Sequence, residues 1–139
     1  MSVLAIVDEI AALLETDSTK RDGSAARPVD YLPDMLYIWP PTETFQRAGM
    51  DFGAEDQRDF RIRIAWATDA AGEVASELRT RVVTDTIHAK AEAYEAVVRG
   101  ARAGVNYNWV EVSQVDYESL VTLTARGFYM DLSGYALPS

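Results

Sequence analysis

The stretch NYNWVEVSQVDYESLVTLTARGFYMDL, residues 106–132, decides the fold of this chain. It is rich in β-branched and aromatic residues, which suit a pleated and half-buried surface, and little in it breaks a strand. The polar run Asp116–Ser119 is typical of a turn. We therefore predict two long antiparallel strands, the second starting near Leu120 and ending at Leu132, before Ser133-Gly134 and a short tail.

Two further segments upstream have strand character. Residues 35–39 form a short apolar run that Pro40-Pro41 must end, because neither proline can donate a ladder hydrogen bond, and such a strand suits a sheet edge. Residues 58–68 alternate, which predicts a half-buried strand with a polar, basic outer face. The inward residues are Phe60, Ile62, Ile64 and Trp66, and the outward residues are Asp59, Arg61, Arg63 and Ala65.

Two segments have the three- and four-residue apolar spacing of a helix. The first covers residues 2–15, with Ser2 as its cap, and the second covers about residues 74–102, where Gly100 and Gly104 end it. We expect both helices on the same face of the sheet. The sequence thus predicts one α+β domain over residues 1–139, with a mostly antiparallel four-stranded sheet and two helices packed on one face.

Two connections stand out. Residues 16–27 are small, charged and aperiodic, which predicts a surface loop. Residues 42–57 form a long loop between the first two strands, and loops of this length are uncommon in compact domains unless they have a function or are disordered. Its apolar residues Phe45, Met50 and Phe52 either contact a partner or hold the loop onto its own domain.

Composition excludes several classes of protein. The chain has no cysteine, so disulfides and thiolate metal sites are excluded. Its 13 basic and 22 acidic residues give a net charge of −9, which disfavours tight non-specific binding to nucleic acid or anionic lipid. The excess acid lies toward the two ends of the sequence. An export signal and a membrane-spanning run are not expected, so the sequence predicts a soluble protein.

No catalytic, cofactor-binding or metal-binding motif is predicted. Asp85, His88 and Glu92 share a helix face and could converge on a metal, but an ordinary polar face is the better reading. Asp116 and Glu118 could form an acid–base pair, although a turn needs such residues too. The serines lack a nucleophile motif, the glycines lack a phosphate-loop motif, and the three tryptophans are best read as packing residues.

Arginine residues on the outer face of the alternating strand differ from scattered surface charges. On an otherwise acidic molecule, Arg61 and Arg63 would form a basic strip that complements the acidic surface of another copy. Together with the long loop, they define the candidate interface. Its residues are Phe45, Arg47, Met50, Phe52, Arg61 and Arg63.

The order of the predicted elements resembles that of the tail terminator proteins of long-tailed bacteriophages, also called minor tail protein U or tail completion proteins. The features that carry the resemblance are the first helix, the strand LYIWPP, the strand FRIRIAW, the long second helix and the closing run YESLVTLTARGFYMDL. These features extend over nearly the whole chain, and the similarity is one of element order rather than of a short motif.

The resemblance implies a structural virion protein with no catalytic residue and no cofactor. Such a protein forms a homo-oligomeric ring, typically of six copies, that caps the tail tube and ends its polymerisation. Its partners would be the tail tube protein and the head–tail connector or stopper protein, and DNA would pass through the channel without specific binding. The protein would be assembled in the host cytoplasm and reside in the tail or neck of the virion. The net charge of −9 fits negative channel walls.

Two alternatives remain open from the sequence. One is a small-molecule-binding or enzymatic domain in which a curved sheet and helices enclose an apolar pocket, with Asp116 or His88 as a base. The aromatic residues that would line this pocket are Trp66, Trp109, Tyr117 and Tyr129. The other is a different head–tail joining protein of the neck.

Overall fold

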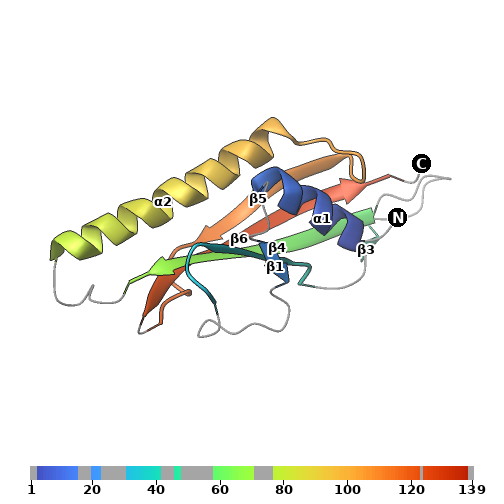
Figure 1. Ribbon diagram of the computed structural model, residues 1–139. Helices are drawn as coiled ribbons and strands as arrows, with labels where there is room; N and C mark the ends of the chain where they lie inside the picture. Colours follow the sequence, from blue (N-terminus) through green and yellow to red (C-terminus); the bar gives the residue numbers. More distant parts are fainter. Residues whose placement is uncertain are drawn as a thin grey trace.

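The computed structural model describes residues 3–15, 20–22, 31–41, 46–47, 58–70, 77–122 and 124–137. Two helices and a single sheet make up this part of the chain (Figure 1). In chain order the elements are α1 Val3–Leu14, β1 Lys20–Asp22, β2 Met35–Trp39, β3 Gln46–Arg47, β4 Arg58–Asp69, α2 Glu77–Gly100, β5 Trp109–Asp116 and β6 Ala125–Ala136.

The sheet has the order β1-β2-β4-β6-β5, and β3 pairs with β4 beyond the end of β2. Its centre is the antiparallel pair of β4 and β6, which are in register over their whole length, from Arg58 opposite Ala136 to Asp69 opposite Ala125. The four strands predicted from sequence correspond to β2, β4, β5 and β6, and they are antiparallel neighbours. The predicted α+β class is therefore confirmed.

The loop predictions are wrong at residues 20–22 and 46–47, where the structure has two short strands. β1 lies within the segment 16–27 and pairs in parallel with β2, while β3 lies within the long connection 42–57. Because β1 flanks β2, the expectation that the proline-ended strand forms a sheet edge is also wrong. Strands of two or three residues are defined by backbone pairing, so they leave no periodic pattern of apolar side chains to detect.

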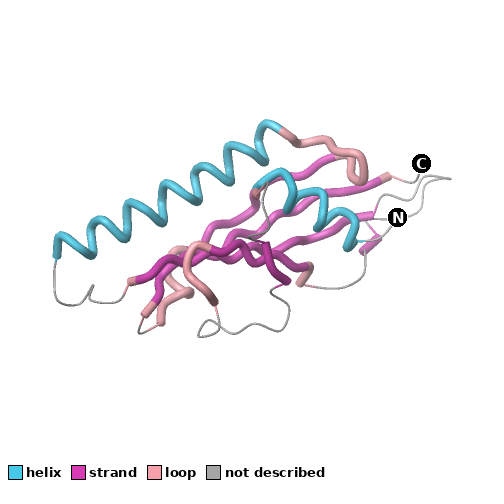
Figure 2. Tube along the Cα trace, viewed as in Figure 1, coloured by secondary structure: helices cyan, strands magenta, loops and turns pink. Residues whose placement is uncertain are grey.

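Both helices lie over the same face of the sheet (Figure 2), and side chains of both contribute to one hydrophobic core with it. The alternation predicted for β4 is confirmed, since Phe60, Ile62, Ile64 and Trp66 are all buried in this cluster. Burying a side chain of this kind contributes about 1.5–3 kcal/mol each. The helix residues in the cluster are Val3, Ile6, Val7, Ile10 and Ala11 of α1 and Val83, Ile87, Ala91, Tyr94 and Val98 of α2.

Polar contacts join the two helices and fix the connection after α2. Glu15 accepts a hydrogen bond from the Tyr94 hydroxyl and forms an ion pair with Lys90 at 2.8 Å. The Glu9 carboxylate accepts three hydrogen bonds, two from the backbone N–H groups of Val105 and Asn106 and one from the Asn106 side chain, at 2.8–2.9 Å. The loop that leads from α2 to β5 is therefore held against α1.

The opposite face of the sheet is not simply a solvent face. Ala65 and Ala67 of β4 are buried there, in a second and smaller cluster. The predicted polar, basic outer face of this strand is therefore wrong at its C-terminal half, because distant aromatic residues cover it. The other members of the cluster are Tyr31, Tyr37, Leu120 and Ala125, with Met35, Trp39 and Tyr129 partly buried against them.

The connection between β5 and β6 is longer than predicted. β5 ends at Asp116, and β6 begins at Ala125 rather than near Leu120. Leu120 is buried outside any strand, and its carbonyl accepts a hydrogen bond from the N–H of Gly127. β6 also continues to Ala136, so Ser133 and Gly134 do not end it. An inward-packed loop leucine and a strand leucine look alike in sequence.

Candidate interaction surfaces

The helix-free face of the sheet carries both arginines of the predicted basic strip. Arg63 forms a bidentate contact with Asp131 of β6, with Nε to Oδ1 at 2.8 Å and Nη2 to Oδ2 at 3.2 Å. Its guanidinium also lies 5.6 Å from the centroid of the Tyr129 ring. Hydrogen bonding to Asp131 raises the pKa of Arg63. Arg63 is thus largely neutralised within its own chain.

Arg61 lies two residues earlier on the same face and is exposed, opposite Ser133 of β6. Within the described part of the chain, no ion pair forms at Arg61. The two arginines therefore differ as candidate interface residues. Arg61 is available to an acidic partner, whereas Arg63 would first have to break its ion pair with Asp131.

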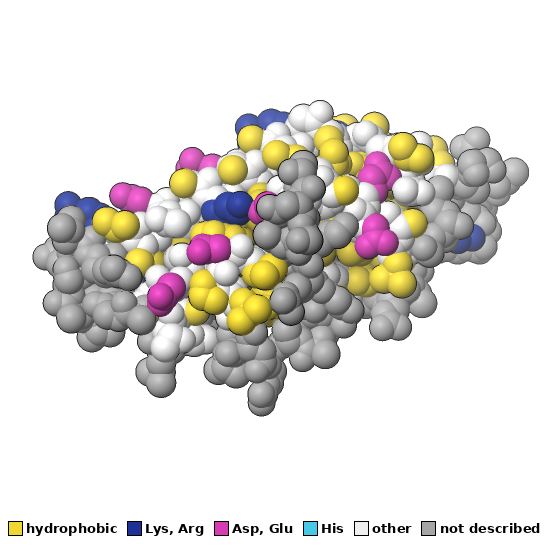
Figure 3. Space-filling view, in the orientation of Figure 1, with side chains coloured by type: hydrophobic (Ala, Val, Ile, Leu, Met, Phe, Trp, Pro, Cys, Tyr) yellow, Lys and Arg dark blue, Asp and Glu magenta, His cyan; other side chains and the backbone are white. Residues whose placement is uncertain are grey.

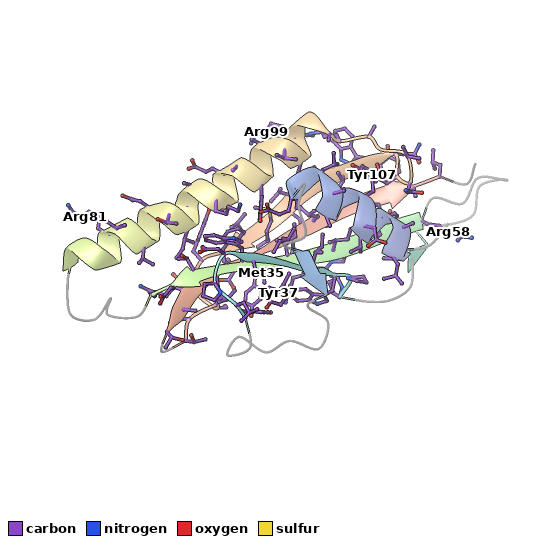
Figure 4. All side chains as sticks on the ribbon, viewed as in Figure 1. Met35, Tyr37, Arg58, Arg81, Arg99 and Tyr107 are labelled. Atoms are coloured by element: carbon purple, nitrogen blue, oxygen red, sulfur yellow. The ribbon has the colours of Figure 1, made fainter. Side chains whose placement is uncertain are left out.

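A cluster of tyrosines adjoins Arg63 on this face. The rings of Tyr31 and Tyr37 lie 4.7 Å apart, and Tyr129 meets Tyr31 edge-on at 6.3 Å. The N–H of Leu32 donates to the Tyr37 hydroxyl at 3.1 Å. Burial and a hydrogen bond with Tyr129 raise the pKa of Tyr31. Figure 4 shows Met35 and Tyr37 on the side of β2 away from the helices.

The remaining predicted interface residues belong to the long connection. Phe45, Met50 and Phe52 lie outside the described residues, so their proposed contact with a neighbouring copy stays a prediction. The backbone of Arg47 lies in β3, opposite Arg58 at the first residue of β4. This position of the connection therefore pairs with the start of β4, the strand that carries Arg61 and Arg63.

The outer surface of α2 has two strips that the sequence analysis did not separate. One is charged or polar and contains Arg81, Asp85, His88, Glu92 and Arg99. The other is exposed, apolar and small, and Figure 3 shows a row of hydrophobic side chains along this helix. Its members recur at alternating four- and three-residue spacing. They are Val82, which is 56% exposed, Thr86, Ala89, Ala93, Ala96 and Gly100, with Val97 beside them.

The helical spacing of these small residues is visible in the sequence, but it does not show that they are exposed. Small residues such as alanine are compatible with a helix whether that side of it is buried or exposed. Their spacing therefore does not by itself indicate exposure. The larger side chains Val83, Ile87, Tyr94 and Val98 defined the buried face of the same helix. Only the packing of α2 on the sheet shows that the second apolar strip faces outward.

His88 has an aromatic partner rather than a set of ligands. Its ring stacks on Tyr117, with centroids 4.2 Å apart and an interplanar angle of 3°. Burial and the nearby acids Glu92 and Glu95 raise the pKa of Tyr117. In the described ranges, no group of three histidine, cysteine, aspartate or glutamate residues could hold a metal ion.

Asp116 forms a turn rather than an acid–base pair. Its carboxylate accepts hydrogen bonds from the N–H groups of Glu118 and Ser119, at 2.8 and 3.0 Å, and from the Ser119 hydroxyl. These bonds lower the pKa of Asp116. The turn interpretation of this segment is therefore confirmed, and the Asp116 carboxylate is occupied by backbone and hydroxyl donors.

The four aromatic residues of the pocket alternative do not converge. Trp66 is buried on the helix side of the sheet beside Phe128, and Tyr117 is on that side against His88. Tyr129 lies on the other face with Tyr31, opposite Ala65 in the ladder. Trp109 pairs with Tyr135 on that face, near the far end of β6. These residues therefore do not line a common cavity.

A groove runs between the C-terminal part of α2 and the edge strand β5. Ion-paired Glu95 and Arg99, 2.8 Å apart, form one wall. The Arg102 guanidinium lies 4.7 Å from the centroid of the Trp109 ring. Figure 4 shows Arg99 on α2 above this end of the sheet. The lining residues are Glu95, Val98, Arg99, Arg102, Glu111 and Val112.

No known protein family matches this sequence, and a search of curated proteins finds no similar one. Among the described residues, no helix has the length and apolar character needed to cross a membrane.

Proposed function

We propose that this protein is a ring-forming structural protein that caps the tail tube of a long-tailed bacteriophage, ends its polymerisation and joins the tail to the head connector. The observation that carries the proposal is the order α1, β2, β4, α2, β5, β6 around one antiparallel sheet. That is the order of elements on which the resemblance to tail terminator proteins rests.

The surfaces of the molecule support assembly into a ring. A ring needs a heterologous interface, in which one patch of a copy meets a different patch of the next. The chain offers two unlike surfaces, the outward apolar strip of α2 and the helix-free sheet face with Arg61 and the tyrosine cluster. The proposed ring is homo-oligomeric, with six copies as the expected number.

The net charge supports the proposed relation to DNA. A charge of −9 per copy gives the assembled ring strongly negative surfaces, and these repel the phosphate backbone. DNA would then pass through the channel without being held there. The proposed protein partners are the tail tube protein on one side and the connector or stopper protein on the other, and the proposed location is the virion tail or neck.

The first experiment is the solution mass of the purified protein by light scattering over a concentration series. The terminator proposal expects a ring-sized mass, or a rise toward one with concentration. A second sample mixed with purified tail tubes should show the protein bound at the tube end. A protein that stays monomeric and also binds neither tubes nor connector would contradict the proposal.

The same mixing experiment separates the neck alternative from the terminator. A protein that acts elsewhere in the neck should bind the connector complex but leave naked tube ends free. Binding to tube ends that stops further addition of tube subunits is expected only of a terminator.

A further inference from the structure

The helix-free face of the sheet carries aromatic side chains that are only half-buried. They are Trp39 of β2 and Tyr129 and Tyr135 of β6. Arg61 of β4 is exposed on the same face. These four residues are called the sheet surface below. Partly exposed aromatic rings and arginine are enriched where proteins bind one another, because a ring offers a large apolar area together with a polar edge.

Arg61 forms no ion pair with another described residue. Its neighbour across the ladder is Ser133, and the next residue in that row is Glu111 of β5, two strands away. Glu111 lines the groove that also contains Arg99 and Arg102, so bases of its own chain already lie beside it. Arg61 is therefore free to pair with an acid of another molecule.

The outward side of α2 carries acids beside its small apolar residues. Asp85 and Glu92 each lie four residues before an exposed alanine, Ala89 or Ala96, so they border the apolar strip. Both acids are exposed, and neither forms an ion pair with another described residue. The helix surface, as it is called below, consists of Val82, Asp85, Ala89, Glu92, Ala93 and Ala96.

The sheet surface and the helix surface are complementary in size and charge. Apolar side chains no larger than valine let bulky rings approach α2 closely, and the sheet surface supplies such rings. The two acids would face Arg61 across the contact, and opposite charges on facing surfaces select the partner and fix its orientation. A helix packed on a sheet face is also how α1 and α2 cover the other side of this sheet.

The two surfaces lie on opposite sides of the molecule. α2 covers one face of the sheet and turns the helix surface to solvent, whereas the sheet surface belongs to the other face (Figure 2). A contact between opposite sides of identical copies is heterologous, so each added copy presents the same free surface again. Contacts of α2 with α2, or of one sheet surface with another, are isologous and join two copies. A single contact of the heterologous kind builds a ring.

We propose that the helix surface of one copy packs on the sheet surface of the next, with Asp85 and Glu92 facing Arg61. This inference specifies the contact within the proposed ring and so rests on the proposed function. Its partner is a second copy of the same chain.

Charge reversal tests the contact. Arg61→Glu alone, and Asp85→Lys with Glu92→Lys, should each weaken self-association about three- to thirtyfold in sedimentation velocity, because attraction across the contact becomes repulsion. The variant that combines all three changes should recover most of the wild-type association. Glu118→Lys is the control, since Glu118 is exposed in the turn after β5 and belongs to neither surface. Circular dichroism verifies that each variant is folded. Reversed variants that associate like wild type, or a combined variant no better than its parents, would overturn the proposal.

Cross-linking gives a second readout, because the natural chain has no cysteine. Ser133→Cys lies opposite Arg61 in the ladder, and Ala89→Cys lies in the apolar strip, so all three charged residues stay in place. A short bismaleimide should join the double variant into a ladder of oligomers, in free assemblies and on tail tubes. A cross-linked dimer from Ala89→Cys alone would indicate helix–helix pairing, and one from Ser133→Cys alone would indicate sheet–sheet pairing. Either result would overturn the proposal.

The outcomes separate this inference from the proposed function. A protein that binds tube ends but gives no ladder there retains the terminator function without this interface. A protein that forms the ladder and fails to bind tubes retains the interface without the terminator function.

Discussion

Two carboxylates show how single residues hold the connections of this fold. Glu9 on α1 ties down the loop after α2, and Asp116 closes the turn after β5. Each accepts backbone N–H groups that would otherwise need water or another acceptor. Carboxylates in such positions act as structural caps, and their contributions can be measured separately from any function.

Replacing Glu9 by alanine should lower the free energy of unfolding by about 1–3 kcal/mol, because three donors in the loop lose a charged acceptor. Urea denaturation gives this value directly. Asp8→Ala serves as the matched control, since Asp8 is an exposed neighbour on the same helix. An equal effect of both substitutions would show that the loss comes from helix charge and not from the loop contact.

Asp116 predicts a dependence of stability on pH. Its folded pKa lies below the ordinary value of 3.8, so its turn stabilises the fold above that pH and loses this contribution as the pH falls through the folded pKa. Asp116→Asn should therefore reduce the loss of stability seen below pH 3.8, measured as the urea midpoint against pH. Glu118→Gln removes a neighbouring carboxylate and should leave that dependence as in the wild type.

At the scale of elements, the β4–β6 pair depends on a close approach at Gly127. A Cβ atom at this position would meet the backbone of Trp66 and lie 2.7 Å from Cα of Ala67. Backbone on a central strand cannot move aside as the end of a side chain can. The glycine is therefore required near the start of β6, where it lies opposite Ala67 of β4.

Gly127→Ala should destabilise the protein by about 1–3 kcal/mol, since the added methyl would overpack the contact between β6 and the β4 backbone. Gly100→Ala is the matched control, because a Cβ there meets nothing within 4 Å and alanine favours a helix. That second change should raise stability by about 0.5–1 kcal/mol. Thermal denaturation of both variants tests the pair, and a stable Gly127→Ala protein would mean that β4 and β6 are less closely packed.

At the scale of the whole molecule, the two faces of the sheet differ in what covers them. One face is buried under both helices, and the other combines a partly buried tyrosine cluster with charged residues. The charged part includes Arg63, which is paired with Asp131, and Arg61, which forms no ion pair with another described residue. Substitutions of Arg61 and of Arg63 can therefore test assembly and stability separately.

Arg61→Glu should weaken ring assembly in light scattering without changing the urea midpoint, because Arg61 is exposed. Arg63→Glu should instead lower stability, since it places a second carboxylate against Asp131. If Arg61→Glu assembles as the wild type does, Arg61 is an ordinary surface residue and the basic strip has no role in assembly.

Hydrophobic periodicity was enough to predict the large elements. The alternation in β4, the helical spacing in α1 and α2 and the strand-rich closing segment are local patterns, and a side chain's spacing along its own element fixes which face it occupies. The turn at Asp116 was also predictable, because its residues bond to their own neighbours.

Features that depend on pairing between distant segments were not predictable in this way. β1 and β3 exist through backbone pairing with β2 and β4, and the covered second face exists because Tyr31 and Leu120 fold back onto β4. For the candidate interface, the sequence placed Arg61 and Arg63 on one face but could not show that Arg63 is paired with Asp131, a residue 68 positions away. The small-residue strip of α2 likewise became a surface only through packing.

The sequence by itself determined the fold class, the two helices, the four main strands and the acidic character of the molecule, because each follows from composition or from spacing within one segment. Only the tertiary structure decided the order of the described strands, the exposed strip on α2 and the pairing of Arg63 with Asp131. The physical reason is that strand order and side-chain partners are set by contacts between residues far apart in the chain, which local patterns do not encode.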